Sequence, residues 1–215
     1  MATILRSLSY RYPWLYDSIS RTAALSVGGE WRFRHLALQG LNLSAPSQIL
    51  DLCCGCGQTT RFLVAFGAQV TGLDASPRSL TQARKNVPQA TFIEGWAEDL
   101  PFADHQFDVV HTSAAMHEMV GDQRRAIFQN AWRVLKPGGT LALVDFHRPH
   151  NPLIWPGLAL FLWLFETETA WHLLGVDLVA ELEAIGFQVS GPRLHAGGSL
   201  QVIQAQRPGR GCTAG

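Results

Sequence analysis

QILDLCCGCGQTT, residues 48–60, is the stretch that decides the fold. Its apolar run at 49–52 predicts a buried strand, and Gly55 and Gly57 predict a tight turn that lets a ligand approach the backbone. Residues 58–66 then predict a helix whose free N–H groups face that ligand. Strand, glycine turn and helix form the first unit of a doubly wound α/β domain, which binds its ligand at the carboxyl ends of the strands.

A second apolar run ends in Asp74, about 20 residues after the glycine turn. A carboxylate at this strand end can accept hydrogen bonds from a ribose diol, in NAD and in S-adenosylmethionine alike. As a structural alternative, Asp74 and Ser76 could cap the helix that Pro77 begins. The dinucleotide motif also needs a third glycine near position 60, where this chain has Thr60. The pattern therefore disfavours a nicotinamide or flavin dinucleotide.

Buried strands and amphipathic helices alternate along the middle of the chain, which predicts a mostly parallel sheet with helices on both faces. A later helix and an antiparallel hairpin are expected to end the domain. The expected strands are 48–53, 69–74, 91–94, 107–112, 140–146, 187–194 and 200–206, and the expected helices are 58–66, 77–86, 122–134 and 178–185.

The chain divides into three parts by composition. Residues 1–44 are expected to form an N-terminal helical cap, with segments near 14–20 and 29–39. Residues 45–206 are expected to form the main domain, which carries an apolar insert near 150–172. The Gly-rich residues 207–215 are expected to form a flexible tail.

Four segments, in order and at matching spacing, resemble class I S-adenosylmethionine-dependent methyltransferases of the small-molecule type. They are ILDLCCGCG, VTGLDASP, EGWAEDLPFADHQFDVVHTSAAMHE and WRVLKPGGTLALVDF. The resemblance implies a Rossmann-like, seven-stranded sheet of order 3-2-1-4-5-7-6 with an antiparallel last strand, and S-adenosylmethionine as cofactor. Tyr16 and Asp17 before a helix, with DLCCG and LKPGG, look most like the quinone and menaquinone biosynthesis branch (methyltransferase type 11).

The resemblance also implies which residues hold the cofactor. The glycine loop would hold its methionine part, Asp74 the ribose, and Ala75 together with the segment after the third strand the adenine. Many relatives carry Asp where this chain has Trp96, so the adenine contact is where the chain departs from the pattern. The expected cofactor residues are Asp51, Cys53, Gly55, Cys56, Gly57, Asp74, Ala75, Trp96, Ala97, Glu98 and Ser113.

Methyl transfer from a sulfonium needs alignment, exclusion of water and, for some acceptors, a base. His117 is the first base candidate because imidazole titrates near neutral pH, although it could equally be a histidine packed under the sheet edge. Asp145 and His147 lie two positions apart on the fifth strand, hence on one face, and form a second candidate pair. Tyr16 is a further candidate, because relatives often lay an N-terminal tyrosine over the donor.

Charge and cysteine content exclude several classes of function. The 17 basic and 17 acidic side chains balance, which argues against a nucleic-acid partner. Cys53, Cys54 and Cys56 lack the second ligand pair of a zinc site, so no metal is expected, and free thiols fit a reducing compartment. Residues 1–17 show no secretory signal, and the apolar run 153–165 is too short to span a bilayer. We therefore expect a cytoplasmic protein.

The insert near 150–172 carries Trp155, Trp163 and Trp171 with almost no charge before Glu166. It could be a helix that covers the core, or it could line an apolar substrate pocket or dock on lipid together with the Arg-rich N-terminus. The sequence thus predicts methyl transfer from S-adenosylmethionine to a small apolar, quinol-like or lipid-like acceptor. The alternatives are an NAD(P)-dependent oxidoreductase and a non-catalytic nucleotide-binding protein. The oligomeric state is not predicted.

Overall fold

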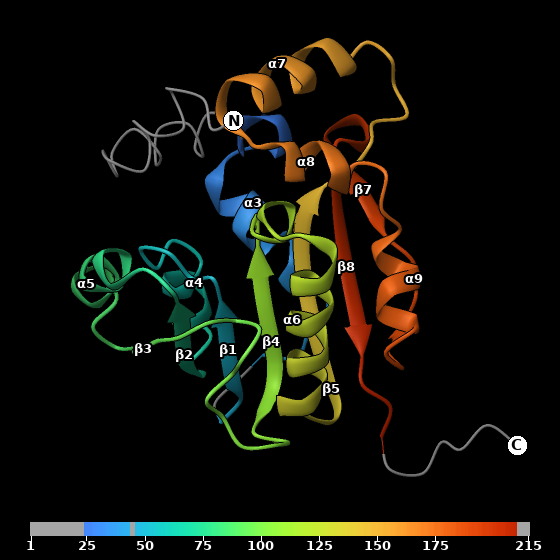
Figure 1. The fold of residues 1–215 in the computed structure, drawn as a ribbon. Coiled ribbons are helices and arrows are strands. Elements are labelled where there is room, and N and C mark those ends of the chain that lie inside the picture. The colour runs from blue at the N-terminus through green and yellow to red at the C-terminus, as the bar shows by residue number, and fades with distance from the viewer. Residues whose placement is uncertain (1–23, 44–45, 210–215) are drawn as a thin grey trace, which may run out of the picture.

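The computed structural model describes residues 24–43 and 46–209, so Tyr16 and the helix expected near 14–20 lie outside the described residues. A central sheet carries helices on both faces (Figure 1). Its strands are β1 Gln48–Leu52, β2 Gln69–Asp74, β3 Thr91–Glu94, β4 Phe107–Ser113, β5 Leu135–Phe146, β6 Gln188–Val189, β7 Arg193–His195 and β8 Leu200–Gln206. The helices are α3 Glu30–His35, α4 Thr60–Val64, α5 Pro77–Asn86, α6 Gly121–Val134, α7 Trp155–Phe165, α8 Glu168–Leu173 and α9 Leu178–Glu183, with short 3₁₀ turns η1 Leu25–Val27, η2 Leu36–Leu38, η3 Met116–Glu118 and η4 Ala196–Gly198.

The strand order is β3-β2-β1-β4-β5-β8-β6, and β7 also pairs with β8. The first five strands are parallel, while β8 runs antiparallel to β5. This confirms the predicted order, with one difference: the strand expected at 187–194 is split into β6 and β7. Gly191, at φ +91°, and Pro192 interrupt it, because proline has no N–H to donate to a ladder.

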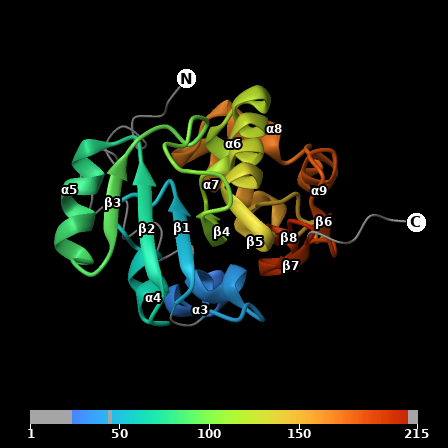
Figure 2. The ribbon, with the colours of Figure 1, turned by 90° about the horizontal axis from the view of Figure 1, so that it is seen from below.

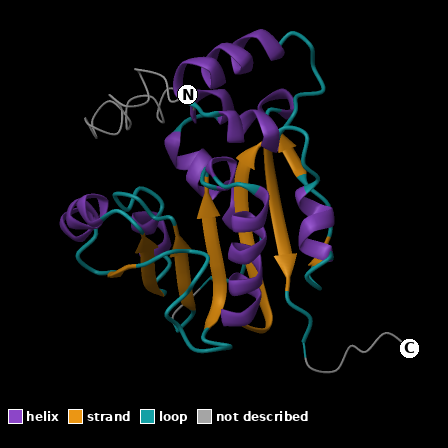
Figure 3. Ribbon diagram, in the orientation of Figure 1, coloured by secondary structure: helices purple, strands orange, loops and turns teal. Residues whose placement is uncertain are grey.

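Successive residues of the central strands face opposite sides of the sheet, and each side has its own core. Ile49 and Val109 pack under α3, η2 and α4. Leu50 and Val110 belong to a larger cluster with α6, α8 and α9. Figures 2 and 3 show the helices on the two sides of the strands. This burial on both faces is what the parallel topology requires.

Strand β5 begins earlier than the sequence predicts. The LKPGG segment, expected as a turn before a strand at 140–146, is itself part of β5. The pairing with β4 shifts from Phe107↔Leu135 to Val109↔Thr140, and Gly138 lies at φ +84° inside the extra length. The segment is therefore a bulge in the strand, which glycine accommodates without steric cost.

The apolar insert forms α7 and α8, which lie above the carboxyl ends of the parallel strands (Figure 1, top). Leu158 and Leu162 of α7 pack toward Phe146, the last residue of β5. This arrangement leaves α7 on the sheet edge where the sequence places the ligand.

Candidate functional site

A cavity of about 310 Å³ opens at the carboxyl ends of β1, β2 and β4, and we call it the donor cavity. Its walls are the loop after β1, the start of α5, the segment after β4, and one side chain of α3. The lining residues are Arg34, Asp51, Cys53, Cys54, Gly55, Cys56, Gln58, Thr59, Asp74, Ala75, Ser76, Ser79, Ser113, Ala114, Ala115, Glu118 and Met119. Seven of the eleven expected cofactor residues are in this set.

Hydrogen bonds tie Asp74 to the glycine loop. Its Oδ2 accepts from the N–H of Gly55 at 2.8 Å, and its Oδ1 accepts from the N–H of Ser76 at 2.9 Å. Ser76 itself caps α5, since its Oγ accepts from the N–H of Ser79. The cap proposed as a structural alternative therefore exists, but Ser76 provides it, and the Asp74 carboxylate lines the cavity.

The two glycines of the turn have different surroundings. Gly55, at φ +55°, lines the donor cavity. Gly57, at φ +81°, is absent from the lining, and a Cβ there would lie 3.2 Å from Cγ2 of Val87, the residue that follows α5. The structure thus brings Gly55 to the ligand site, whereas it places Gly57 against the neighbouring helix.

A buried polar chain runs beneath the cavity. Asp51 is 2% exposed, and its carboxylate pairs with His111 Nδ1 at 2.8 Å and accepts from Thr60 Oγ1 at 2.6 Å. Arg34 donates to Thr59 Oγ1 at 3.4 Å and brings a positive charge to the lining. Neither contact was predicted from the sequence, because Arg34 lies 25 positions from Thr59 and His111 lies 60 positions from Asp51.

The charges of the lining fit S-adenosylmethionine better than a dinucleotide. Asp51, Asp74 and Glu118 supply carboxylates, against the one guanidinium of Arg34 among the lining residues. S-adenosylmethionine carries a sulfonium, an ammonium and a single carboxylate, which this set complements. A pyrophosphate would instead bring two negative charges toward three carboxylates.

Of the residues expected beside the adenine, Ala75 lines the donor cavity, whereas Trp96, Ala97 and Glu98 are not among its lining residues. Trp96 is 63% exposed, and Ala97 belongs to the core between sheet and α6. The Glu98 carboxylate accepts a hydrogen bond from Gln123 Nε2 at 2.9 Å. The adenine contact therefore remains a prediction.

His117 and Asp145 form a buried pair. His117 Nδ1 lies 2.7 Å from Asp145 Oδ1, and its Nε2 lies 3.3 Å from Glu166 Oε2. Burial lowers the pKa of His117, but the charge and hydrogen bonds of Asp145 and Glu166 outweigh it and raise the pKa to about 10. A protonated imidazole that is 3% exposed cannot act as a base toward the methyl acceptor. The alternative of a histidine packed under the sheet edge therefore fits His117 better.

His147 does not join Asp145. The N–H groups of Ala115, Met116 and His117 reach Asp145 Oδ2 at 2.8–3.3 Å. His147 Nδ1 instead lies 2.9 Å from the carbonyl oxygen of Gly198, so this nitrogen carries a proton. The predicted pair of Asp145 and His147 is therefore wrong, because the His147 ring pairs with the backbone of η4 whereas the Asp145 carboxylate pairs with η3.

Two cysteines of the loop, Cys53 and Cys54, favour the thiol form. Burial, followed by the charge of a neighbouring aspartate, raises the pKa of both Cys53 and Cys54 above the ordinary thiol range. A thiolate nucleophile or a thiolate metal site at the loop is therefore disfavoured.

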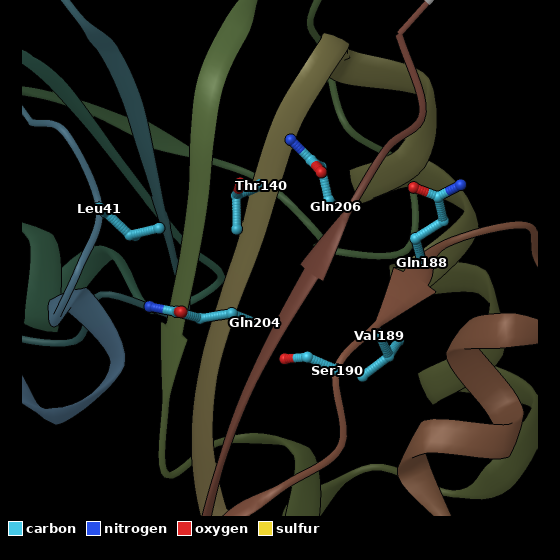
Figure 4. Close-up of a pocket in the computed structure, with 7 residues that line it drawn as sticks. All are labelled: Leu41, Thr140, Gln188, Val189, Ser190, Gln204 and Gln206. Carbon is cyan, nitrogen blue, oxygen red and sulfur yellow. The ribbon is translucent and has the colours of Figure 1, made fainter. Parts of the chain in front are cut away.

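A second hollow, of about 430 Å³, lies near the opposite end of β5 and beside β6 and β8 (Figure 4). All of its lining residues are uncharged. Gln204 and Gln206 use their amide N–H groups on backbone carbonyls of Ala37, Gln39 and Gly138. This hollow offers no titratable group for chemistry, whereas the donor cavity is lined by carboxylates and a guanidinium.

Comparisons with known proteins agree with this geometry. A family model described as a methyltransferase domain matches residues 49–139. The chain is 57% identical to an uncharacterized methyltransferase of Synechocystis sp., over 96% of this chain and 97% of that protein. It is 32% identical to the 2-phytyl-1,4-naphtoquinone methyltransferase of Nostoc sp., over 70% of this chain and 68% of that protein. A TehB-like S-adenosylmethionine-dependent methyltransferase structure from Corynebacterium glutamicum superposes with a TM-score of 0.68 at 18% identity, covering 94% of this chain and 98% of that chain.

Proposed function

The chain belongs to the S-adenosylmethionine-dependent methyltransferases, and on that premise we propose that its acceptor is a small apolar molecule of the quinol class. Membership of this family excludes the alternative that the chain is a nicotinamide-dependent oxidoreductase. The cofactor supplies an electrophilic methyl group on a sulfonium, so the enzyme must chiefly align the two partners and exclude water.

Residues of the donor cavity would hold the cofactor by complementary charge. Asp74 has acceptor capacity left beyond its bonds to Gly55 and Ser76, which suits ribose hydroxyl groups. The guanidinium of Arg34 suits the carboxylate of the methionine part. Ser113 and Glu118 line the cavity on the β4 side, where the acceptor must approach if it enters from under α7.

The apolar surface of α7 is the observation that carries the proposal. The helix WPGLALFLWLF has no charged residue, and Leu158 and Leu162 already bury its inner face. Its outer face still exposes Leu160 at 56% and Trp163 at 66%. A helix that only covered a core would place polar groups on that face. The Nostoc relative, whose name states a phytyl-naphthoquinone substrate, supports the same class of acceptor.

The proposal extends to peripheral contact with a membrane. Within residues 24–43 and 46–209 no helix is long and apolar enough to span a bilayer. Trp155, Trp163 and Trp171 nevertheless stand exposed on α7 and α8, as in helices that lie in the interface of a bilayer. An acceptor dissolved in lipid could then pass under α7 without crossing water.

Turnover on a graded panel tests the acceptor class. We expect binding of S-adenosylmethionine but not of NADH in calorimetry, and methyl incorporation into reduced quinones that increases with the length of the apolar tail. Each tail carbon buried would contribute about 0.8 kcal/mol, which makes the trend steep. Transfer only to polar acceptors would contradict the proposed class, and donor binding without transfer to any acceptor would favour a non-catalytic protein.

A further inference from the structure

A group of titratable side chains lies at the border between the donor cavity and α7. One ligand atom each of His117, Glu118 and Glu166 lies within 4.8 Å of the other two. We propose that these three side chains bind a divalent first-row transition-metal ion, with Asp145 orienting the histidine. Such an ion would overturn the expectation that the chain holds no metal, which rested on the cysteines alone.

The distances suit coordination after a small adjustment. Metal bonds to nitrogen and oxygen of about 2.0–2.2 Å place neighbouring ligand atoms about 3–3.5 Å apart. His117 Nε2 and Glu166 Oε2 are already 3.3 Å apart. Glu118 follows His117 in η3, so its carboxylate can close on the same point by rotation of its side chain.

The outer shell of the site is already in place. His117 Nδ1 donates to Asp145 Oδ1 at 2.7 Å, which leaves Nε2 directed toward Glu166. Asp145 is in turn held by backbone N–H groups, including those of Met116 and Phe146 at 2.8 and 2.7 Å. A carboxylate that orients a histidine in this way is the usual partner of a metal-bound imidazole.

The charge of the cluster also favours a divalent cation. Asp145, Glu118 and Glu166 place three carboxylates around one imidazole, with Asp145 2% and the Glu166 side chain 13% exposed. A divalent ion bound by the imidazole would bring positive charge to these carboxylates.

One nitrogen and two carboxylate ligands indicate Mn²⁺, Co²⁺, Fe²⁺ or Zn²⁺ rather than Mg²⁺ or Ca²⁺, which prefer oxygen alone. Three protein ligands leave coordination positions open, as catalytic metal sites do. Because Glu118 also lines the donor cavity, an oxygen of the acceptor could occupy an open position. That role depends on the proposed function, whereas binding of the ion does not.

Calorimetric titration of the untagged, chelator-treated full-length protein with Mn²⁺ and Co²⁺ tests the site. We expect one ion per chain, and at least a tenfold weaker affinity in Glu166→Gln and in Glu118→Gln. Glu168→Gln, an exposed acid two residues from Glu166, is the matched control and should bind like the wild type. Circular dichroism would confirm that each variant is folded.

The absorption spectrum of the Co²⁺ complex separates this site from the loop cysteines. Ligation by nitrogen and oxygen should give visible d–d bands without the near-ultraviolet charge-transfer band of a thiolate. The proposal is overturned if the wild type shows no saturable binding, if all variants bind equally, or if the thiolate band appears. Absence of binding would mean that protonated His117 alone occupies the place of the cation. Because turnover is not the readout, that failure leaves methyl transfer unaffected.

Discussion

The two halves of the site are built by different means. In the donor half, the Asp74 carboxylate accepts hydrogen bonds from the backbone N–H groups of Gly55, in the loop after β1, and of Ser76, just after β2. Both donors lie within 20 residues of Asp74. In the acceptor half, Asp145 of β5, His117 of η3 and Glu166 at the end of α7 lie in contact, and burial strengthens the electrostatic interactions between them. Local motifs thus shape the first half, whereas the second exists only when distant segments pack. Substitutions in the two halves should therefore have different effects on stability and on ligand binding.

The largest expected effect is a loss of stability on Asp145→Ala in the acceptor half. The substitution leaves protonated His117 buried without its main partner. It also leaves the backbone N–H groups that donate to Asp145 without an acceptor. Together these losses should lower the unfolding free energy by about 3–5 kcal/mol. Asp104→Ala, which breaks the exposed ion pair with Arg133, should cost less than about 1 kcal/mol. Urea denaturation measures both, and equal losses would show that the buried pair has no special weight.

The same pair predicts how stability depends on pH. Because the pKa of His117 is raised to about 10, its stabilising charge is complete below pH 6.5 and is lost as the pH rises toward 10. Unfolding free energy of the metal-free protein should fall by up to about 1.4 kcal/mol per pH unit in this window. Glu166→Gln should flatten the fall, because one partner of the charged ring is gone. A ring found neutral at pH 8 by nitrogen NMR would contradict the assignment.

In the donor half, Gly57→Val should lower stability by about 1–3 kcal/mol, since valine is strained at positive φ and would contact Val87. Gly55→Val is the paired variant: it is also strained, at φ +55°, and it should in addition weaken S-adenosylmethionine binding, because Gly55 lines the cavity. Thermal unfolding and calorimetry separate the two effects. If Gly57→Val weakened binding of the folded protein as strongly as Gly55→Val, the distinction between the two glycines would fail.

Asp74→Ala should weaken S-adenosylmethionine binding at least tenfold, or about 1.4 kcal/mol, through lost hydrogen bonds to the ligand and a looser Gly55 loop. Glu94→Ala is the matched control: this exposed acid pairs in register with Asp74 at the end of β3. Calorimetry should show unchanged affinity in the control. Unchanged affinity in Asp74→Ala would remove this residue from the site.

The smallest expected effect concerns α7. Trp163→Ser should raise the acceptor KM a few-fold and reduce binding to anionic vesicles, while leaving donor affinity and folding nearly unchanged. Trp31→Ser on α3 is the control, because both tryptophans are 66% exposed. Equal effects of the two substitutions would make α7 an ordinary covering helix.

Most of the fold follows from the sequence, because strand periodicity, glycine turns and helix caps are local properties. The expected strands at 69–74 and 91–94 and the helix at 77–86 agree with β2, β3 and α5 in both bounds. The structure differs from the prediction where pairing with a neighbouring strand decides the local conformation. LKPGG becomes a bulge because β4 pairs on both sides of it, and Gly191 with Pro192 divides one strand into β6 and β7.

The loop and the acid of the donor cavity could be predicted from the sequence alone, since the ends of two adjacent parallel strands carry them to one edge of the sheet. Only the tertiary structure decided that Arg34 joins this lining and that Glu166 meets His117. It also separated Asp145 from His147 and paired it with His117, 28 positions away. The physical reason is that a buried charge takes the partner that packing brings within reach, and packing between distant segments leaves no periodic trace in the sequence.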